Sequence, residues 1–190
     1  MIPHSIAARL TQPFSDTQFT PTKFASGQEK AKFANALTRF IASDFPLSGF
    51  TRKLYGRLSC SFGHIAHYSR LGFYEHFFED LQSKVTFLEE TLQSPPIGDP
   101  AYSFSDVERL VQKRLRACDV LGIYRLARQS EISRRDRVLY ERLAEKYACT
   151  AALVGAAPSV AHVHPQSKPD RRRAEQIAVM DDLFERVHPN

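Results

Sequence analysis

The segment from 57 to 80 concentrates side chains that could perform acid–base or metal chemistry. His64 and His67 are three residues apart, so on a helix they project to the same side. Imidazole and carboxylate groups are suitable metal ligands, and the candidate metal set is His64, His67, His76 and Asp80. The spacing departs from the His-Glu-x-x-His signature, which favours a structural role in which each histidine tip bonds a carbonyl or a tyrosine. Because neither side of this segment carries much charge, we expect His64 and His67 to be at least half buried.

An arginine on an otherwise apolar helix stripe extends this candidate site. Arg114 shares its stripe with valine and leucine residues, where an arginine either lays its stem along the core or pairs with an internal carboxylate. The functional alternative is a pocket that Arg114 reaches together with His64, His67 and Tyr68.

The positive charge of the chain is concentrated in one stretch. Residues 109–146 carry 11 basic and 5 acidic side chains, whereas the whole chain has a net charge of +5. Such a concentration predicts a surface that attracts anions, and arginine forks match the geometry of phosphates. Interleaved carboxylates such as Glu131 and Asp136 are the counter-argument, because they are typical of an ordinary solvated face. The candidate anion-binding residues are Arg109, Lys113, Arg116, Arg128, Arg134 and Arg135.

Several kinds of chemistry lack their minimum motifs in this sequence. There is no glycine-rich phosphate loop, no serine elbow and no Cys-x-x-Cys pair, so no cofactor is expected. The three cysteines are widely spaced and suit a reducing, cytoplasmic setting. No apolar run approaches the ~20 residues that a membrane span needs, so no membrane partner is expected.

Apolar periodicity predicts an all-α protein, a compact bundle of six or seven helices. Two serine–glutamate pairs, Ser26 with Glu29 and Ser105 with Glu108, predict capping boxes at helix starts. The expected helices cover residues 26–45, 47–58, 64–71, 74–92, 105–128, 134–153 and 170–187. The expected core residues are Phe33, Leu37, Phe40, Phe77, Leu81, Leu88, Leu110, Cys118, Leu121, Leu139 and Leu143.

Proline and small polar residues divide the chain into four parts. We expect an irregular N-terminal arm over 1–25, a helical domain over 26–156, a linker over 157–169 and a C-terminal helix over 170–187. The apolar side of that last helix must be covered by the bundle or by a second chain, so a homo-oligomer through this helix is one expectation.

These observations favour a cytoplasmic binding protein over an enzyme. The expected partner is a polyanion, either nucleic acid or an acidic protein or nucleoprotein surface, and an inhibitor or accessory subunit would have this profile. The alternative is a metal-dependent or acid–base enzyme that uses a site at His64 and His67.

Overall fold

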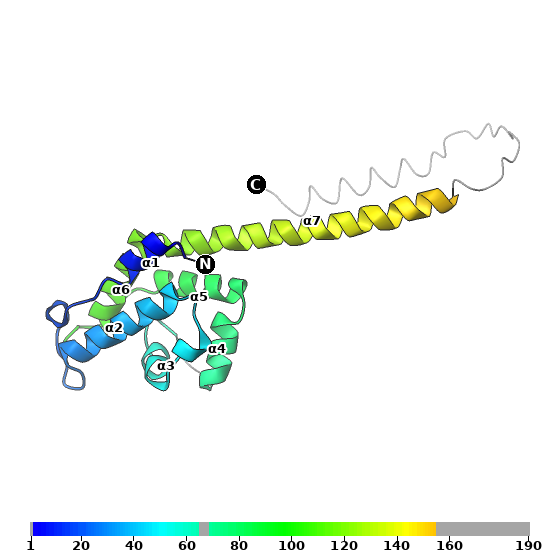
Figure 1. The fold of residues 1–190 in the computed structure, drawn as a ribbon. Helices are drawn as coiled ribbons and strands as arrows, with labels where there is room; N and C mark the ends of the chain where they lie inside the picture. Colours follow the sequence, from blue (N-terminus) through cyan, green and yellow to red (C-terminus); the bar gives the residue numbers. More distant parts are fainter. Residues whose placement is uncertain (1, 65–68, 155–190) are drawn as a thin grey trace, which may run out of the picture. The chain divides into compact units, whose positions relative to one another are not determined.

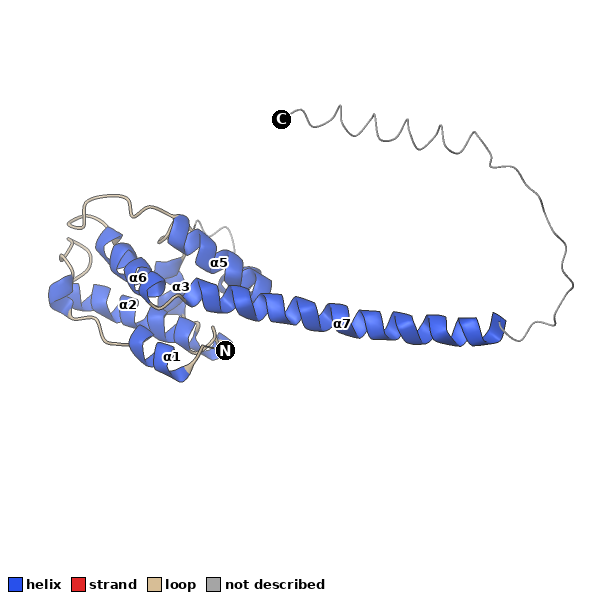
Figure 2. Cartoon of the chain, turned by 90° about the horizontal axis from the view of Figure 1, so that it is seen from above, coloured by secondary structure: helices blue, strands red, loops and turns tan. Residues whose placement is uncertain are grey.

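The structure, a computed structural model, describes residues 2–64 and 69–154 of the chain, and its helices are shown in Figure 1 and Figure 2. Those residues contain helices and no strand, which confirms the predicted all-α fold. The α-helices are α1 (His4–Leu10), α2 (Gly27–Ala42), α3 (Arg52–Leu58), α4 (Arg70–Phe78), α5 (Leu81–Gln93), α6 (Ser105–Ala117) and α7 (Val120–Val154). Two short 3-10 turns are η1 (Asp16–Gln18) and η2 (Leu47–Gly49).

The chain divides into two compact units, Met1–Leu143 and Ala144–Asn190. All the sites discussed below belong to the first unit. The predicted linker over 157–169 and the predicted helix over 170–187 lie outside the described residues, as does the proposed oligomer contact through that helix.

Phenylalanine rings fill the centre of the first unit. Phe45 and Phe78 are stacked with ring centroids 5.0 Å apart, and Phe40 and Phe87 meet them edge to face. Such offset and edge-to-face pairs add to the free energy gained by burying the ring area. The rings come from α2, α4, α5 and the loop after α2, so the cluster fixes these helices against one another.

Most of the predicted core is confirmed, and its C-terminal part is wrong. The buried members are Phe33, Leu37, Phe40, Phe77, Leu88 and Cys118, while Leu81, Leu110 and Leu121 are half-buried at the edge of the core. Leu139 is 57% exposed and Leu143 is 43% exposed, because their part of α7 extends past the residues that form the core.

The N-terminal segment is less irregular than predicted. It forms α1, and Leu10, Phe14 and Phe19 are buried in the core. The proline residues bound this helix without preventing it, since Pro3 occupies its N-cap position.

Helix α2 begins where its capping box predicts. The Ser26 hydroxyl accepts from the Glu29 amide at 3.2 Å, and a Glu29 carboxylate oxygen accepts from the Ser26 amide at 2.8 Å. Lys30, in the first turns of this helix, is fully buried, and its Nζ lies 3.0 Å from the Asp106 carboxylate of α6. It also donates to the carbonyls of Pro100 and Ser103, both at 2.8 Å, so the buried charge is paired and saturated with acceptors.

The long helix predicted over 74–92 is two helices. Asp80 has an extended backbone (φ −124°, ψ 174°) and caps α5, because its carboxylate accepts from the Ser83 amide at 2.7 Å. Helix α4 starts earlier than predicted, after Ser69, whose hydroxyl accepts from the Gly72 amide. The short helix predicted over 64–71 falls partly on residues 65–68, which lie outside the described residues.

The second predicted capping box is wrong. Ser105 is the first residue of α6, and its hydroxyl donates to the Gly98 carbonyl at 2.8 Å. The Glu108 carboxylate accepts instead from the Phe62 amide at 2.9 Å, and thereby ties α6 to the loop after α3.

The predicted helix over 105–128 ends early, and the next helix has no break. Asp119 takes a left-handed backbone (φ 46°) between α6 and α7. The Asp119 carboxylate lies close above Gly122, so a side chain at position 122 would displace it. Helix α7 then continues through residues 129–133, where the sequence predicted a break.

Candidate functional site

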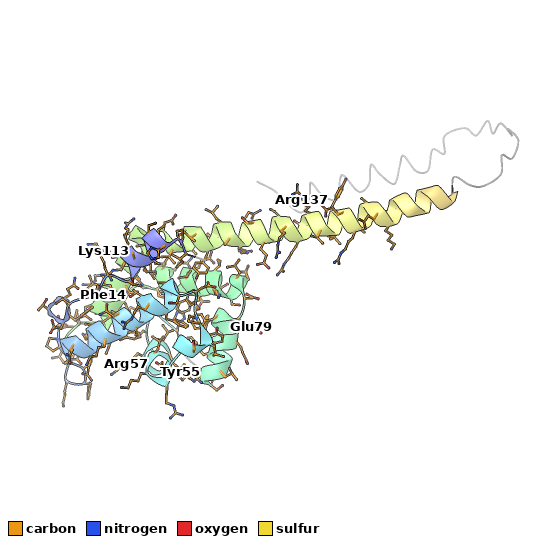
Figure 3. All side chains as sticks on the ribbon, in the orientation of Figure 1. Phe14, Tyr55, Arg57, Glu79, Lys113 and Arg137 are labelled. Carbon is orange, nitrogen blue, oxygen red and sulfur yellow. The ribbon has the colours of Figure 1, made fainter. Side chains whose placement is uncertain are left out.

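The predicted basic residues of α6 have different roles. Arg109 and Lys113 are exposed one turn apart, as the sequence predicts (Lys113 is labelled in Figure 3). Arg116 is exposed as well, but its guanidinium donates to the Leu92 carbonyl at 2.5 Å. Arg116 therefore joins the end of α6 to the end of α5, and this contact competes with any anion for its donors.

Helix α7 carries the most regular basic pattern. Arg128, Arg135 and Arg142 follow one another at intervals of seven residues, which is about two helical turns, so they lie on one side of the helix. We call these three residues the arginine row. Because α7 is continuous, all three residues lie on one helix, with no break between residues 128 and 134.

The surroundings of the row are shallow and open. Arg134, Arg135 and Arg142 line a surface depression of about 340 Å³ together with Val138 and Leu139. Side chains from Ile132 to Tyr147 are exposed, and Figure 3 shows them projecting from α7 as sticks.

Carboxylates only partly offset the charge of the row. Arg135 forms an ion pair with Glu131 on the preceding turn, and both side chains reach solvent. Such an exposed pair contributes less than about 1 kcal/mol, so a stronger anionic partner can replace it. Arg128 and Arg135 also line a second depression, of about 350 Å³, beside the Asp80 that caps α5.

His64 is buried, as predicted for it, and only 5% of the residue is exposed. Its ring stacks on Phe87 with centroids 4.9 Å apart, and its Nε2 forms a hydrogen bond of 3.2 Å with the Thr91 hydroxyl. Burial lowers the pKa of the imidazole from its ordinary 6.5 to about 4. The ring is therefore neutral at pH 7, and the 3.5 Å between its Nδ1 and Glu90 is not an ion pair there.

The other residues of the histidine set are dispersed. His67 and Tyr68 lie outside the described residues. His76 is exposed on α4 against the Phe77 ring, and the Asp80 carboxylate is engaged in capping α5. Among the residues that the structure describes, no group of three or more histidine, cysteine or carboxylate side chains could hold a metal ion.

Of the two roles that the sequence allows, Arg114 takes the packing role, because its contacts lie with the N-terminal segment. Its guanidinium carbon lies 3.4 Å from the centroid of the Phe14 ring. The same side chain donates to the carbonyls of Leu10 and Gln12, so it fastens the N-terminal segment onto α6.

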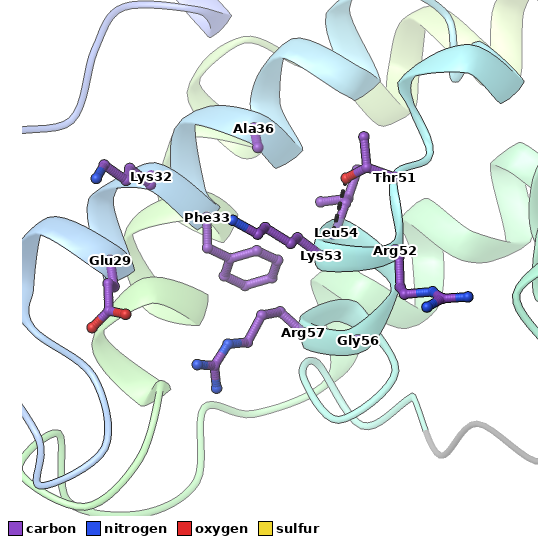
Figure 4. A pocket seen from close by; sticks show the side chains of 10 residues that line it. All are labelled: Glu29, Lys32, Phe33, Ala36, Thr51, Arg52, Lys53, Leu54, Gly56 and Arg57. Atoms are coloured by element: carbon purple, nitrogen blue, oxygen red, sulfur yellow. Dashed lines mark hydrogen bonds between the residues drawn. The ribbon is translucent and has the colours of Figure 1, made fainter.

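Sequence reasoning missed a groove between α2 and α3. It has a volume of about 700 Å³, an apolar floor and a basic rim, and it is shown in Figure 4. The rim residues are Lys32, Arg52, Lys53 and Arg57. They belong to the part of the chain that is nearly neutral overall, so charge counted along the sequence hides them. The signal that could have found them is local: on each of two consecutive helices, basic residues stand directly beside an apolar position, Phe33 in α2 and Leu54 in α3.

Comparisons with protein-family models, with curated proteins and with solved structures found no match to this chain. Across the described part of the chain, every helix falls short of the length or the hydrophobicity that crossing a membrane requires.

Proposed function

We propose that the protein binds the phosphate backbone of nucleic acid through the arginine row of α7. The observation that carries this proposal is the alignment of Arg128, Arg135 and Arg142 on one side of a single continuous helix. At a rise of ~1.5 Å per residue, their Cα atoms are spaced by about 10.5 Å along the axis. Each guanidinium presents planar donors that match a phosphate.

The exposure of the helix supports the same proposal. An α-helix fits the major groove of duplex DNA, provided that it can approach without its own domain in the way. In the first unit, α7 is exposed from Ile132 to Leu143 and meets this requirement over that length. Arg109 and Lys113 on α6 add further exposed positive charge to that unit.

The proposal includes the compartment and the kind of complex in which the protein acts. A cytoplasmic accessory or inhibitory subunit of a nucleoprotein complex would need backbone contacts without base recognition. Such contacts predict similar affinities for unrelated sequences, since phosphates carry no sequence information.

The test is a binding assay with the full chain and two unrelated DNA duplexes, measured by fluorescence anisotropy over a range of salt concentrations. We expect both duplexes to bind, with an affinity that falls steeply as salt rises. Each contacted phosphate contributes about 0.9 to the log–log salt slope. Replacing Arg128, Arg135 and Arg142 together with alanine should therefore reduce the slope by about 2–3 and weaken binding by more than about tenfold at low salt.

The matched control removes the same charge elsewhere. Lys23, Arg39 and Arg137 are exposed, and Arg137 lies two residues beyond Arg135, about 200° further round α7 (it is labelled in Figure 3). The Lys23→Ala/Arg39→Ala/Arg137→Ala variant should retain binding within about twofold. If it loses as much affinity as the row variant, net charge and not the row explains binding. If the wild type fails to bind either duplex at low salt, the proposal is wrong.

A further inference from the structure

The groove between α2 and α3 has a floor built from the hydrophobic core. Phe33 of α2 and Leu54 of α3 line it, and both are buried. Ala36 completes the α2 side with a small side chain, which leaves space above the Phe33 ring. The resulting volume of about 700 Å³ is within the range of ~300–1,000 Å³ that ligand-binding clefts occupy.

The rim of the groove is basic. In Figure 4, Lys53 extends from α3 across the space above Phe33, and Arg57 extends from the same helix below that ring. The Arg57 guanidinium carbon lies 4.8 Å from the centroid of the Phe104 ring, a contact that fixes its position. Lys32 on α2 and Arg52 on α3 are exposed further along the rim.

The single carboxylate that lines the groove is already engaged. Glu29 accepts hydrogen bonds from the amide and hydroxyl of Ser26 in the capping box of α2. These bonds lower the pKa of the Glu29 carboxyl. One carboxylate against four basic side chains leaves the groove with an excess of positive charge.

We infer that the α2–α3 groove binds an acidic peptide segment that inserts one large apolar side chain between Lys53 and Arg57. The apolar floor accepts a leucine or phenylalanine side chain, and the basic rim pairs with the carboxylates that flank it. Nucleic acid also satisfies the rim, but its bases carry polar edges that an apolar floor would leave without hydrogen-bond partners. The inference goes beyond the nucleic-acid proposal, because it uses other elements and another ligand.

The chain offers an unusual way to block this groove without changing its charge. Gly56 lines the groove, and a Cβ added there meets no atom within 4 Å. A leucine at this position projects into the space, and it also favours the helix, since leucine has a higher helix propensity than glycine. Gly56→Leu therefore fills the groove in a protein that is expected to fold at least as well.

The experiment titrates the full chain with a fluorescein-labelled peptide in which glutamates surround one leucine and one phenylalanine. We expect saturable binding that weakens at least about tenfold in Gly56→Leu and in Lys53→Ala/Arg57→Ala. The Lys23→Ala/Arg137→Ala variant removes the same charge from exposed positions outside the groove and should bind as the wild type does. A peptide with serine in place of the two apolar residues should bind at least about tenfold more weakly.

Three results would overturn the inference: no binding of the peptide to the wild type, unchanged binding in Gly56→Leu, or equal binding of the serine peptide. The last two would show attraction by charge alone. Because the groove variants keep the arginine row intact, their DNA binding is measured in parallel. Loss of peptide binding with retained DNA binding separates this site from the proposed function.

Discussion

At the scale of single residues, burial decides what His64 can do. The imidazole is enclosed by the rings of Phe73, Phe77 and Phe87, which replace water without offering a charge. Its only close carboxylate, among the described residues, is the half-exposed Glu90 at 3.5 Å. A ring in this position contributes a neutral hydrogen bond to Thr91 and aromatic packing.

The pH dependence of stability follows from this neutral ring. In the unfolded chain His64 takes up a proton near pH 6.5, whereas in the folded protein it does so only near pH 4. The unfolded state therefore binds more protons between these values, and the folded state loses stability as the pH falls from 6.5 toward 4. We expect a loss on the order of 2 kcal/mol from this residue.

The measurement is urea unfolding of the wild type and of His64→Gln at several pH values. Glutamine keeps a hydrogen-bonding group near Thr91 but does not titrate. The difference in unfolding free energy between the two proteins should shrink as the pH falls through this window. A constant difference would show that His64 titrates alike in both states.

His64 and Arg114 show what single residues reveal in a sequence. The burial of His64 was predictable, because the positions around it carry little charge. The role of Arg114 was not, because its partners Phe14, Leu10 and Gln12 lie about a hundred positions away. Helix periodicity places an arginine on an inward side, but it does not identify the segment that packs there.

At the scale of elements, caps determine where the helices stop and start. The apolar positions from Tyr74 to Leu92 keep one helical spacing across the break at Asp80, so periodicity alone predicts one helix. The cue to the break was Asp80 three residues before Ser83, an arrangement in which aspartate competes for the backbone amide.

Removing the Asp80 cap should destabilise the protein measurably. The Asp80 carboxylate accepts from the amide and hydroxyl of Ser83, and these bonds lower the pKa of its carboxyl. We expect Asp80→Ala to cost about 1 kcal/mol in the free energy of unfolding, because an amide of the first turn of α5 loses its acceptor.

Asp80→Asn is the matched comparison, since asparagine is an equally good cap without the charge. It should lie within a few tenths of a kcal/mol of the wild type in chemical denaturation. An alanine variant as stable as the asparagine variant would mean that water replaces the cap at no cost.

At the scale of the whole molecule, α7 begins in the hydrophobic core and carries most of the arginine row beyond it. Tyr124 is the last buried residue of this helix in the first unit, and its hydroxyl donates to Asp44 at 2.7 Å. The sequence indicated where positive charge is concentrated, but it also placed Leu139 and Leu143 in the core. Helical spacing of leucines is the same whether a neighbour covers them or not, so only the tertiary structure could distinguish these cases.

The exposed course of α7 also has a consequence for the kinetics of backbone opening. Amides near Tyr124 are protected by the core, so their hydrogen exchange should require global unfolding. Amides from Ser133 to Leu143 depend on helix hydrogen bonds alone, and short helical stretches without tertiary contacts open readily in water. In hydrogen-exchange mass spectrometry, peptides from 133–143 should exchange far sooner than peptides around Tyr124. Equal protection of both segments from exchange would contradict this expectation and would reveal a partner that covers the exposed helix. If the arginine row binds DNA, added DNA should slow exchange in 133–143 more than in the peptides around Tyr124.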